Sequence, residues 1–145
     1  MGLDIGQRRV GVAISDFTRT LARPLSVLTR PRGEHDVVAM VGAEITRLAA
    51  EEDGVREVVV GLPLRLDGSP NDMTARVSAF ADALRARIGL PVVFQDERLS
   101  SVEAESRLAV REKDWRVRKQ RLDAAAAAVI LQDYLDSRSV TIDRE

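Results

Sequence analysis

Short aliphatic runs alternate with amphipathic stretches along this chain, and their order predicts an α/β sheet. Five runs are expected as strands: residues 3–5, 10–14, 22–28, 58–60 and 91–94. The polar tetrapeptide Gly6-Gln7-Arg8-Arg9 joins the first two runs and predicts a hairpin. The run at 58–60 is three consecutive valines, which is typical of a strand covered on both faces.

Apolar residues recur at helical spacing between residues 37 and 49 and again between residues 73 and 88. The second of these helices is expected to begin at Ser69, which precedes a proline. A capping-box pattern at Ser100 predicts a third helix, and an alanine-rich segment predicts a last helix over residues 122–135. This order of segments predicts a mixed five-stranded sheet with helices on both faces, in a single domain covering residues 1–145.

Composition narrows the class of protein. A chain of 145 residues that is 45% hydrophobic can bury a core, but it is too short for two lobes that close on a nucleotide. It has no cysteine, no secretory signal and no apolar stretch long enough to span a bilayer. We therefore expect a cytoplasmic protein that does not engage a membrane.

Three acidic residues lie beside predicted buried segments, where an uncompensated charge is costly. Asp4 lies in the first predicted strand, Glu97 follows the last one, and Asp123 precedes the alanine run. Because the chain has no cysteine and only one histidine, we expect a hard cation bound by oxygen, Mg²⁺ or Mn²⁺ rather than zinc. Without metal, at least one of these carboxyl groups should have a raised pKa.

Each acidic residue also has a structural explanation. Asp123 could interact with the dipole of a helix start, and Glu97 could form a salt bridge. Asp4 is harder to explain in this way, because aspartate is disfavoured in strands. Turn or surface positions are expected for Asp16 and Asp96, and a backbone role before a helix for Gly61.

Basic residues concentrate in the stretch from Arg107 to Arg121, which contains seven Lys or Arg and only two acidic residues. The whole chain, by contrast, has a formal net charge of −1. Such a patch favours a polyanion approaching one face, although a solvated helix face is the alternative. Trp115 in this stretch is either a packing residue or a base-stacking platform. Residues expected to contact nucleic-acid phosphates are Arg8, Arg9, Arg98, Lys113, Arg116, Arg118 and Lys119.

Four motifs occur in order along the chain: Gly2-Leu3-Asp4-Ile5-Gly6, Val60-Gly61-Leu62-Pro63-Leu64, Asp96-Glu97-Arg98-Leu99-Ser100 and Asp123-Ala124-Ala125-Ala126. Each is weak alone, but in this order and spacing the chain resembles the RuvX/YqgF family over nearly its whole length.

The resemblance implies an RNase H-like fold related to the RuvC Holliday-junction resolvases. It implies a nuclease that cleaves four-way DNA junctions or trims the 5′ end of the 16S ribosomal RNA precursor. Asp4, Glu97 and Asp123 would be the catalytic residues and the ligands of two Mg²⁺ or Mn²⁺ ions. RuvC-type enzymes have a further acid one turn beyond the helical aspartate, where this chain has alanine.

Two other classes remain as alternatives. A non-catalytic nucleic-acid-binding protein of the same fold would lack metal-dependent cleavage. An actin-like or sugar-kinase-like ATPase also begins with an Asp-x-Gly hairpin, but it needs a second lobe. A homodimer, which symmetric junction cleavage would require, stays open.

Overall fold

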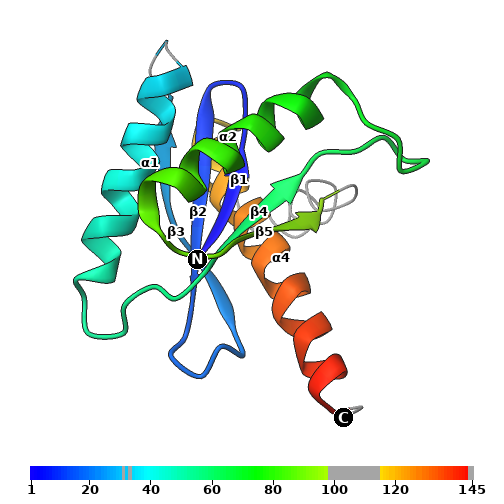
Figure 1. The fold of residues 1–145 in the computed structure, drawn as a ribbon. Coiled ribbons are helices and arrows are strands. Elements are labelled where there is room, and N and C mark those ends of the chain that lie inside the picture. The colour runs from blue at the N-terminus through cyan, green and yellow to red at the C-terminus, as the bar shows by residue number, and fades with distance from the viewer. Residues whose placement is uncertain (31, 33, 98–114, 144–145) are drawn as a thin grey trace.

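The computed structural model describes residues 1–30, 32, 34–97 and 115–143, with the side chains of 34, 35, 115–122 and 139–143 excepted. Its elements are β1 (Gly2–Ile5), β2 (Arg9–Ser15), β3 (Ala22–Thr29), α1 (Glu34–Ala49), β4 (Val58–Leu62), α2 (Asp72–Ile88), β5 (Val92–Asp96) and α4 (Trp115–Asp143). The five predicted strands are all present (Figure 1). The helix predicted at Ser100 lies outside the described residues.

The strands form one sheet in the order β3-β2-β1-β4-β5. β1 pairs antiparallel with β2, and β2 with β3, whereas β4 lies parallel to both β1 and β5. The predicted hairpin is confirmed, since the Gly6 amide donates to the Arg9 carbonyl at 2.9 Å. Because β1, β4 and β5 are parallel, their carboxyl ends meet at one edge of the sheet.

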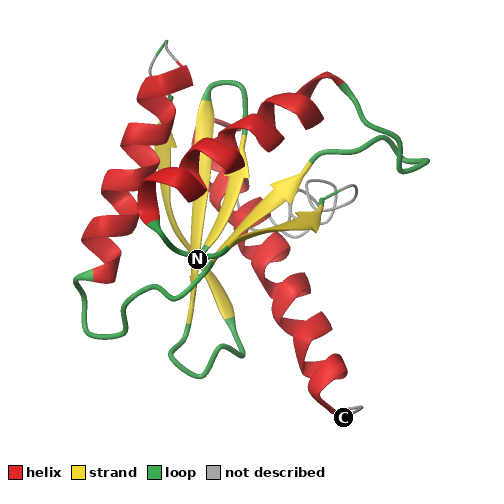
Figure 2. Cartoon of the chain, viewed as in Figure 1, coloured by secondary structure: helices red, strands yellow, loops and turns green. Residues whose placement is uncertain are grey.

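Helices cover both faces of this sheet, α1 and α2 on one side and α4 on the other (Figure 2). On β1 and β2, Leu3 and Val12 join the core under α1 and α2, whereas the next residue, Ala13, packs with Ile130 and Leu131 of α4. The predicted mixed sheet with helices on both faces is therefore confirmed.

The face toward α4 is built from small residues. An added Cβ at Gly2 would lie 2.8 Å from the Leu131 Cβ, and one at Gly11 only 1.9 Å from the Asp123 carbonyl oxygen. The buried alanines Ala124 and Ala127 lie at these contacts, since the Ala124 amide nitrogen is 3.2 Å from the Cβ added at Gly11 and the Ala127 carbonyl oxygen is 3.0 Å from the one added at Gly2. The backbones of sheet and helix can approach closely only because both surfaces lack bulk, which fixes the position of α4 across β1 and β2.

The predicted start of α2 is wrong by two residues. The helix is capped by Asn71, whose side chain accepts from the Met73 and Thr74 amides. Ser69 instead donates its hydroxyl to Asp67 at 2.6 Å in the preceding turn. Asn71 and Thr74 form a reciprocal capping box, which satisfies more of the free amides at the helix start than Ser69 could.

No helix in the described part of the chain is both long and apolar enough to cross a bilayer.

Candidate active site

Asp4 projects from the sheet face that α4 covers. The strand alternates, so its neighbours Leu3 and Ile5 enter the opposite core. Across the β1–β2 pair it lies opposite Gly11, which adds no side chain beside it. Burial is the largest cause that raises the pKa of Asp4 to about 6, and the negative charge of Asp123 adds to it.

Glu97 lies one residue beyond the end of β5 and brings a second carboxyl group to Asp4. Its amide donates to the Leu62 carbonyl at 3.3 Å, so the hydrogen bonding between β4 and β5 continues one residue beyond the end of β5. Burial, followed by the negative charge of Asp4 and a hydrogen bond to Asp4, raises the pKa of Glu97 to about 8. The same hydrogen bond lowers the pKa of Asp4, so Glu97 is the donor and the Asp4 carboxylate the acceptor over the pH range in which the pair holds one proton.

The raised pKa expected of the metal-free carboxylates is thus found at two of the three. Within the described residues the group that Glu97 contacts is another acid, which does not fit the salt-bridge explanation. Among the described residues, neither Asp4 nor Glu97 has an ion-pair partner.

Asp123 lies in the third turn of α4, eight residues after Trp115, so the helix-start explanation of this residue is wrong. Its carboxylate forms an ion pair with Arg9, with 3.4 Å between Nε and Oδ2. Both side chains are partly buried, 22% exposed for Arg9 and 30% for Asp123. The negative charge of Asp123 is close enough to raise the pKa of Asp4, although the Asp123 carboxylate pairs with Arg9 of the hairpin.

The chemistry of these oxygens fits a hard divalent cation. Two carboxyl groups share a proton in a buried contact, where a cation in place of that proton would allow both to ionise. In the metal-free structure, no three acidic or imidazole side chains of the described residues lie close enough together to hold a metal ion. Asp4 and Glu97 are therefore the pair that the structure brings together, with Asp123 as a neighbour held by Arg9.

The β1–β2 hairpin turn places positive charge beside Asp123. Arg8 is exposed, and together with Gly6, Arg9 and Asp123 it lines an open cavity of about 300 Å³ between the turn and α4. Arg30 orders this turn, because its guanidinium donates to the Gly6 carbonyl at 2.7 Å and its amide to the Arg8 carbonyl at 2.8 Å. The role of Arg30 had no signal in the sequence, since it depends on β3 pairing beside the turn.

The chain matches the RuvX family, described as Holliday junction resolvase, over residues 1–137. It is a member of that family. A relative from Chloroflexus aggregans, named "Putative pre-16S rRNA nuclease", is 45% identical over 139 residues, which cover 95% of this chain and 93% of the relative. A relative of the same name from Burkholderia ambifaria is 43% identical, with 96% and 89% covered.

Solved structures of Thermus thermophilus RuvC share the fold of this RuvX family member. One superposes with a TM-score of 0.55 at 16% identity, covering 97% of this chain and 95% of that one. Another, RuvC in complex with a Holliday junction substrate, gives a TM-score of 0.53 at 18% identity, with 95% and 93% covered. The predicted RNase H-like fold and the predicted family are both confirmed.

Five of the seven residues expected to contact nucleic acid lie outside the described residues or side chains. Arg98 and Lys113 lie outside the described residues, and the side chains of Arg116, Arg118 and Lys119 on α4 are not described. The backbone of α4 nevertheless begins at Trp115, so the residues from 115 to 121 belong to the same helix as Asp123.

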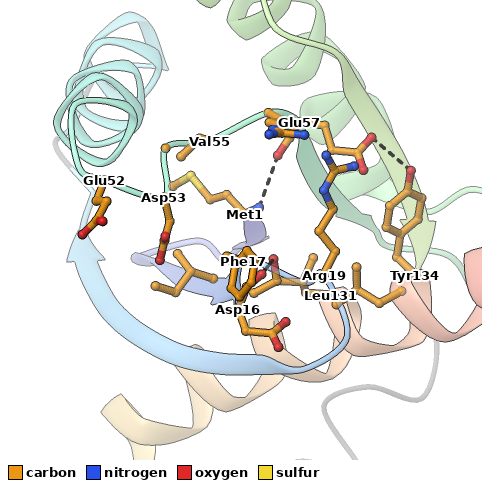
Figure 3. A pocket seen from close by; sticks show the side chains of 15 residues that line it. Met1, Asp16, Phe17, Arg19, Glu52, Asp53, Val55, Glu57, Leu131 and Tyr134 are labelled. Atoms are coloured by element: carbon orange, nitrogen blue, oxygen red, sulfur yellow. Dashed lines mark hydrogen bonds between the residues drawn. The ribbon is translucent and has the colours of Figure 1, made fainter.

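A second cavity, of about 220 Å³, lies at the other end of β1, around Met1. It is also lined by acids, but these have other roles (Figure 3). Asp16 accepts from Thr18, Thr20 and Leu21 within its own turn, as expected of a turn residue. Glu57 accepts from Tyr134 and Arg138. The acids of this cavity are thus already satisfied or solvated, unlike Asp4 and Glu97.

Proposed function

We propose that this RuvX family member is a divalent-metal-dependent nuclease that hydrolyses phosphodiester bonds in structured nucleic acid. The observation that carries the proposal is the partly buried contact of Asp4 with Glu97, two acids without a cationic partner among the described residues, at the carboxyl edge of the sheet. The family description and the names of the relatives agree with this reaction.

Asp4, Glu97 and Asp123 would hold Mg²⁺ or Mn²⁺, in our proposal two ions. Bound there, these ions would supply an activated water and stabilise the leaving oxygen of an in-line displacement. Asp4 is central, because Glu97 contacts it on one side and Asp123 acts on it from α4. To hold a metal ion, Glu97 would lose the proton that it donates to Asp4, and Asp123 would leave its ion pair with Arg9.

Arg8 and Arg9 would bind the phosphate next to the bond that is cleaved. Both belong to a turn that Arg30 holds in place, and both border the open cavity beside Asp123. When Arg9 releases Asp123, its guanidinium is free to pair with a phosphate oxygen. Arg9 would then neutralise the charge of Asp123 before substrate binds and the charge of the phosphate afterwards. Arg98 and the basic residues from Lys113 to Lys119 would bind further phosphates along the nucleic-acid backbone.

The substrate is a four-way DNA junction, the 16S rRNA precursor, or both. Phosphate contacts do not distinguish them, because they report the backbone and not the bases. The deciding experiment compares cleavage of a four-way junction with cleavage of an RNA that spans the 5′ end of 16S rRNA, each with Mg²⁺ and with Mn²⁺. Binding to both without cleavage of either would favour the non-catalytic alternative.

Two further features belong to this proposal. We place the protein in the cytoplasm, since it has no cysteine and its proposed substrates are intracellular nucleic acids. We propose a homodimer for junction cleavage, because two symmetric cuts need two sites. Sedimentation of the protein with and without a junction tests the dimer.

A further inference from the structure

Asp4 is flanked by glycine on both neighbouring strands. On β2 its direct partner is Gly11. On β4, Val60 pairs with Leu3, so the residue beside Asp4 on that strand is Gly61. Both glycines share the face that α4 covers, and each leaves a space on one side of the aspartate.

These two spaces are filled differently. The Gly11 space holds backbone, since an added Cβ would lie 1.9 Å from the Asp123 carbonyl oxygen and 2.6 Å from its carbonyl carbon. The Gly61 space holds the ends of side chains, since an added Cβ would lie 2.6 Å from Glu97 Oε2 and 2.6 Å from Ile130 Cδ1. The carboxylate of Glu97 therefore lies directly over the Cα of Gly61, against the helix.

We infer that Gly61 is a positioning residue for the metal site, because its missing side chain leaves the space in which the Glu97 carboxylate meets Asp4. The inference rests on the proposed role of Glu97 as a metal ligand. No left-handed backbone is involved, since Gly61 is absent from the residues with positive φ. The steric contact with Glu97 is what requires glycine here.

An alanine at Gly61 should disturb the site more than the fold. The two atoms it would meet are the far ends of flexible side chains, which can move aside at small cost. Moving Glu97 by about 1 Å is nevertheless enough to reduce turnover about 100-fold when reacting groups must be aligned. Loss of a group that orients a metal ligand typically weakens metal binding about 10-fold to 100-fold.

The test compares Gly61→Ala with a matched control, Gly42→Ala. Gly42 lies on α1, on the other side of the sheet, and its Cβ would also meet only a flexible side chain, Arg87 Nε at 2.9 Å. We expect Gly61→Ala to melt within about 3 °C of wild type. Its dissociation constant for Mn²⁺, titrated calorimetrically without substrate, should rise at least about 10-fold. Gly42→Ala should keep wild-type metal affinity and cleavage.

A double variant separates the two atoms that fill the space. Ile130→Val removes Cδ1, so Gly61→Ala with Ile130→Val relieves the contact with the helix and leaves the contact with Glu97. Metal affinity should stay low in this double variant. Recovery to wild-type affinity would overturn the inference, because the obstacle would then be Ile130. A Gly61→Ala protein that fails to fold would also contradict it, since the structure predicts a small cost.

Glu97→Gln distinguishes this inference from the function on which it depends. If Glu97→Gln is inactive while Gly61→Ala binds Mn²⁺ and cleaves like wild type, only the positioning role is wrong. If Glu97→Gln cleaves like wild type, the ligand role of Glu97 fails and the positioning role fails with it.

Discussion

At the scale of single residues, one shared proton decides how the metal-free site behaves. Asp4 and Glu97 are partly buried side by side, and the proton on Glu97 spares the protein two adjacent negative charges. A metal ion that replaces this proton gains both carboxylates as ligands. Metal binding should therefore release a proton and strengthen as the pH rises through the raised pKa values of about 6 for Asp4 and about 8 for Glu97.

The first prediction is that Asp4→Asn, Glu97→Gln and Asp123→Asn each reduce cleavage to background while the protein stays folded. Their effects on stability should differ. At pH 8 without metal, Asp4→Asn and Glu97→Gln should hold or raise the free energy of unfolding, because each removes a buried charge. Asp123→Asn should not raise it, because Arg9 then loses its partner. Denaturant melts and a cleavage assay test both parts, and wild-type cleavage by Asp123→Asn would remove it from the site.

The second prediction concerns pH. The pKa values of Asp4 and Glu97 are raised by burial from 3.8 and 4.5 to about 6 and about 8, so the folded protein binds their protons more tightly than the unfolded chain does. The stabilisation from these protons is complete below pH about 4 and is lost as the pH rises through 6 to 8. It should amount to on the order of a few kcal/mol.

Thermal melts from pH 4 to 9 in chelator check this prediction when wild type is compared with the double variant Asp4→Asn, Glu97→Gln. The difference between the two curves should grow between pH 5 and 8 in favour of the variant, and saturating Mn²⁺ should reverse it. Parallel curves over this range would show that the two acids do not share a buried proton.

Sequence reasoning located Asp4 and Glu97 from their places beside apolar runs and expected them at one metal site, but it did not predict the hydrogen bond between them. That contact depends on β1 and β5 lying on either side of β4, and strand order is not written in any single segment. The same holds for the pairing of Arg9 with Asp123 and for the space over Gly61. Gly61 lies within β4, so the sequence interpretation of it as a backbone position before a helix missed its contact with Glu97.

At the scale of elements, α4 links the proposed metal site to the basic stretch. The sequence predicted a helix over residues 122–135, whereas α4 spans Trp115–Asp143. The apolar pattern stops at the lysines and arginines, yet the segment from 115 to 122 contains neither Gly nor Pro, and its arginines, lysine and glutamine are good helix formers. The helix therefore begins well before the alanine run, and the sequence of its first two turns is rich in basic residues.

The third prediction is that replacing Lys113, Arg116, Arg118 and Lys119 by alanine weakens binding to DNA and RNA alike. The salt dependence should flatten by up to about 0.7 to 0.9 in log–log slope for each lost phosphate contact. Single-turnover cleavage at saturating protein should change far less, because the acids perform the chemistry. Fluorescence anisotropy over a series of salt concentrations measures the affinity and the slope.

A control with the same loss of charge uses four exposed arginines outside this stretch, Arg23, Arg56, Arg65 and Arg76. It should bind nearly as wild type does. Equal losses in both variants would show a general charge effect, and unchanged binding in the first would place the substrate near Arg8 and Arg9 instead.

At the scale of the whole molecule, the acidic side chains at the two ends of the sheet differ in their partners. At the end near Met1, the Glu57 carboxylate is satisfied by Tyr134 and Arg138, which joins α4 to the segment before β4. At the other end, Asp4 and Glu97 lack such a partner among the described residues. Asp4 and Glu97 can therefore be changed without disturbing the contacts of Glu57 with α4, whereas Asp123 also pairs α4 with the hairpin through Arg9.

The fourth prediction is that chelation abolishes cleavage, that Mg²⁺ or Mn²⁺ restores it, and that Ca²⁺ binds without supporting turnover. All proposed ligands are carboxylate oxygens, which accept each of these cations. Ca²⁺ takes longer bonds and looser geometry, so it should not align the attacking and leaving oxygens. Thermal stabilisation by Ca²⁺ should disappear in Asp4→Asn, whereas cleavage by wild type should require Mg²⁺ or Mn²⁺. Full cleavage in excess chelator would contradict a metal-dependent reaction, whatever ions the site can bind.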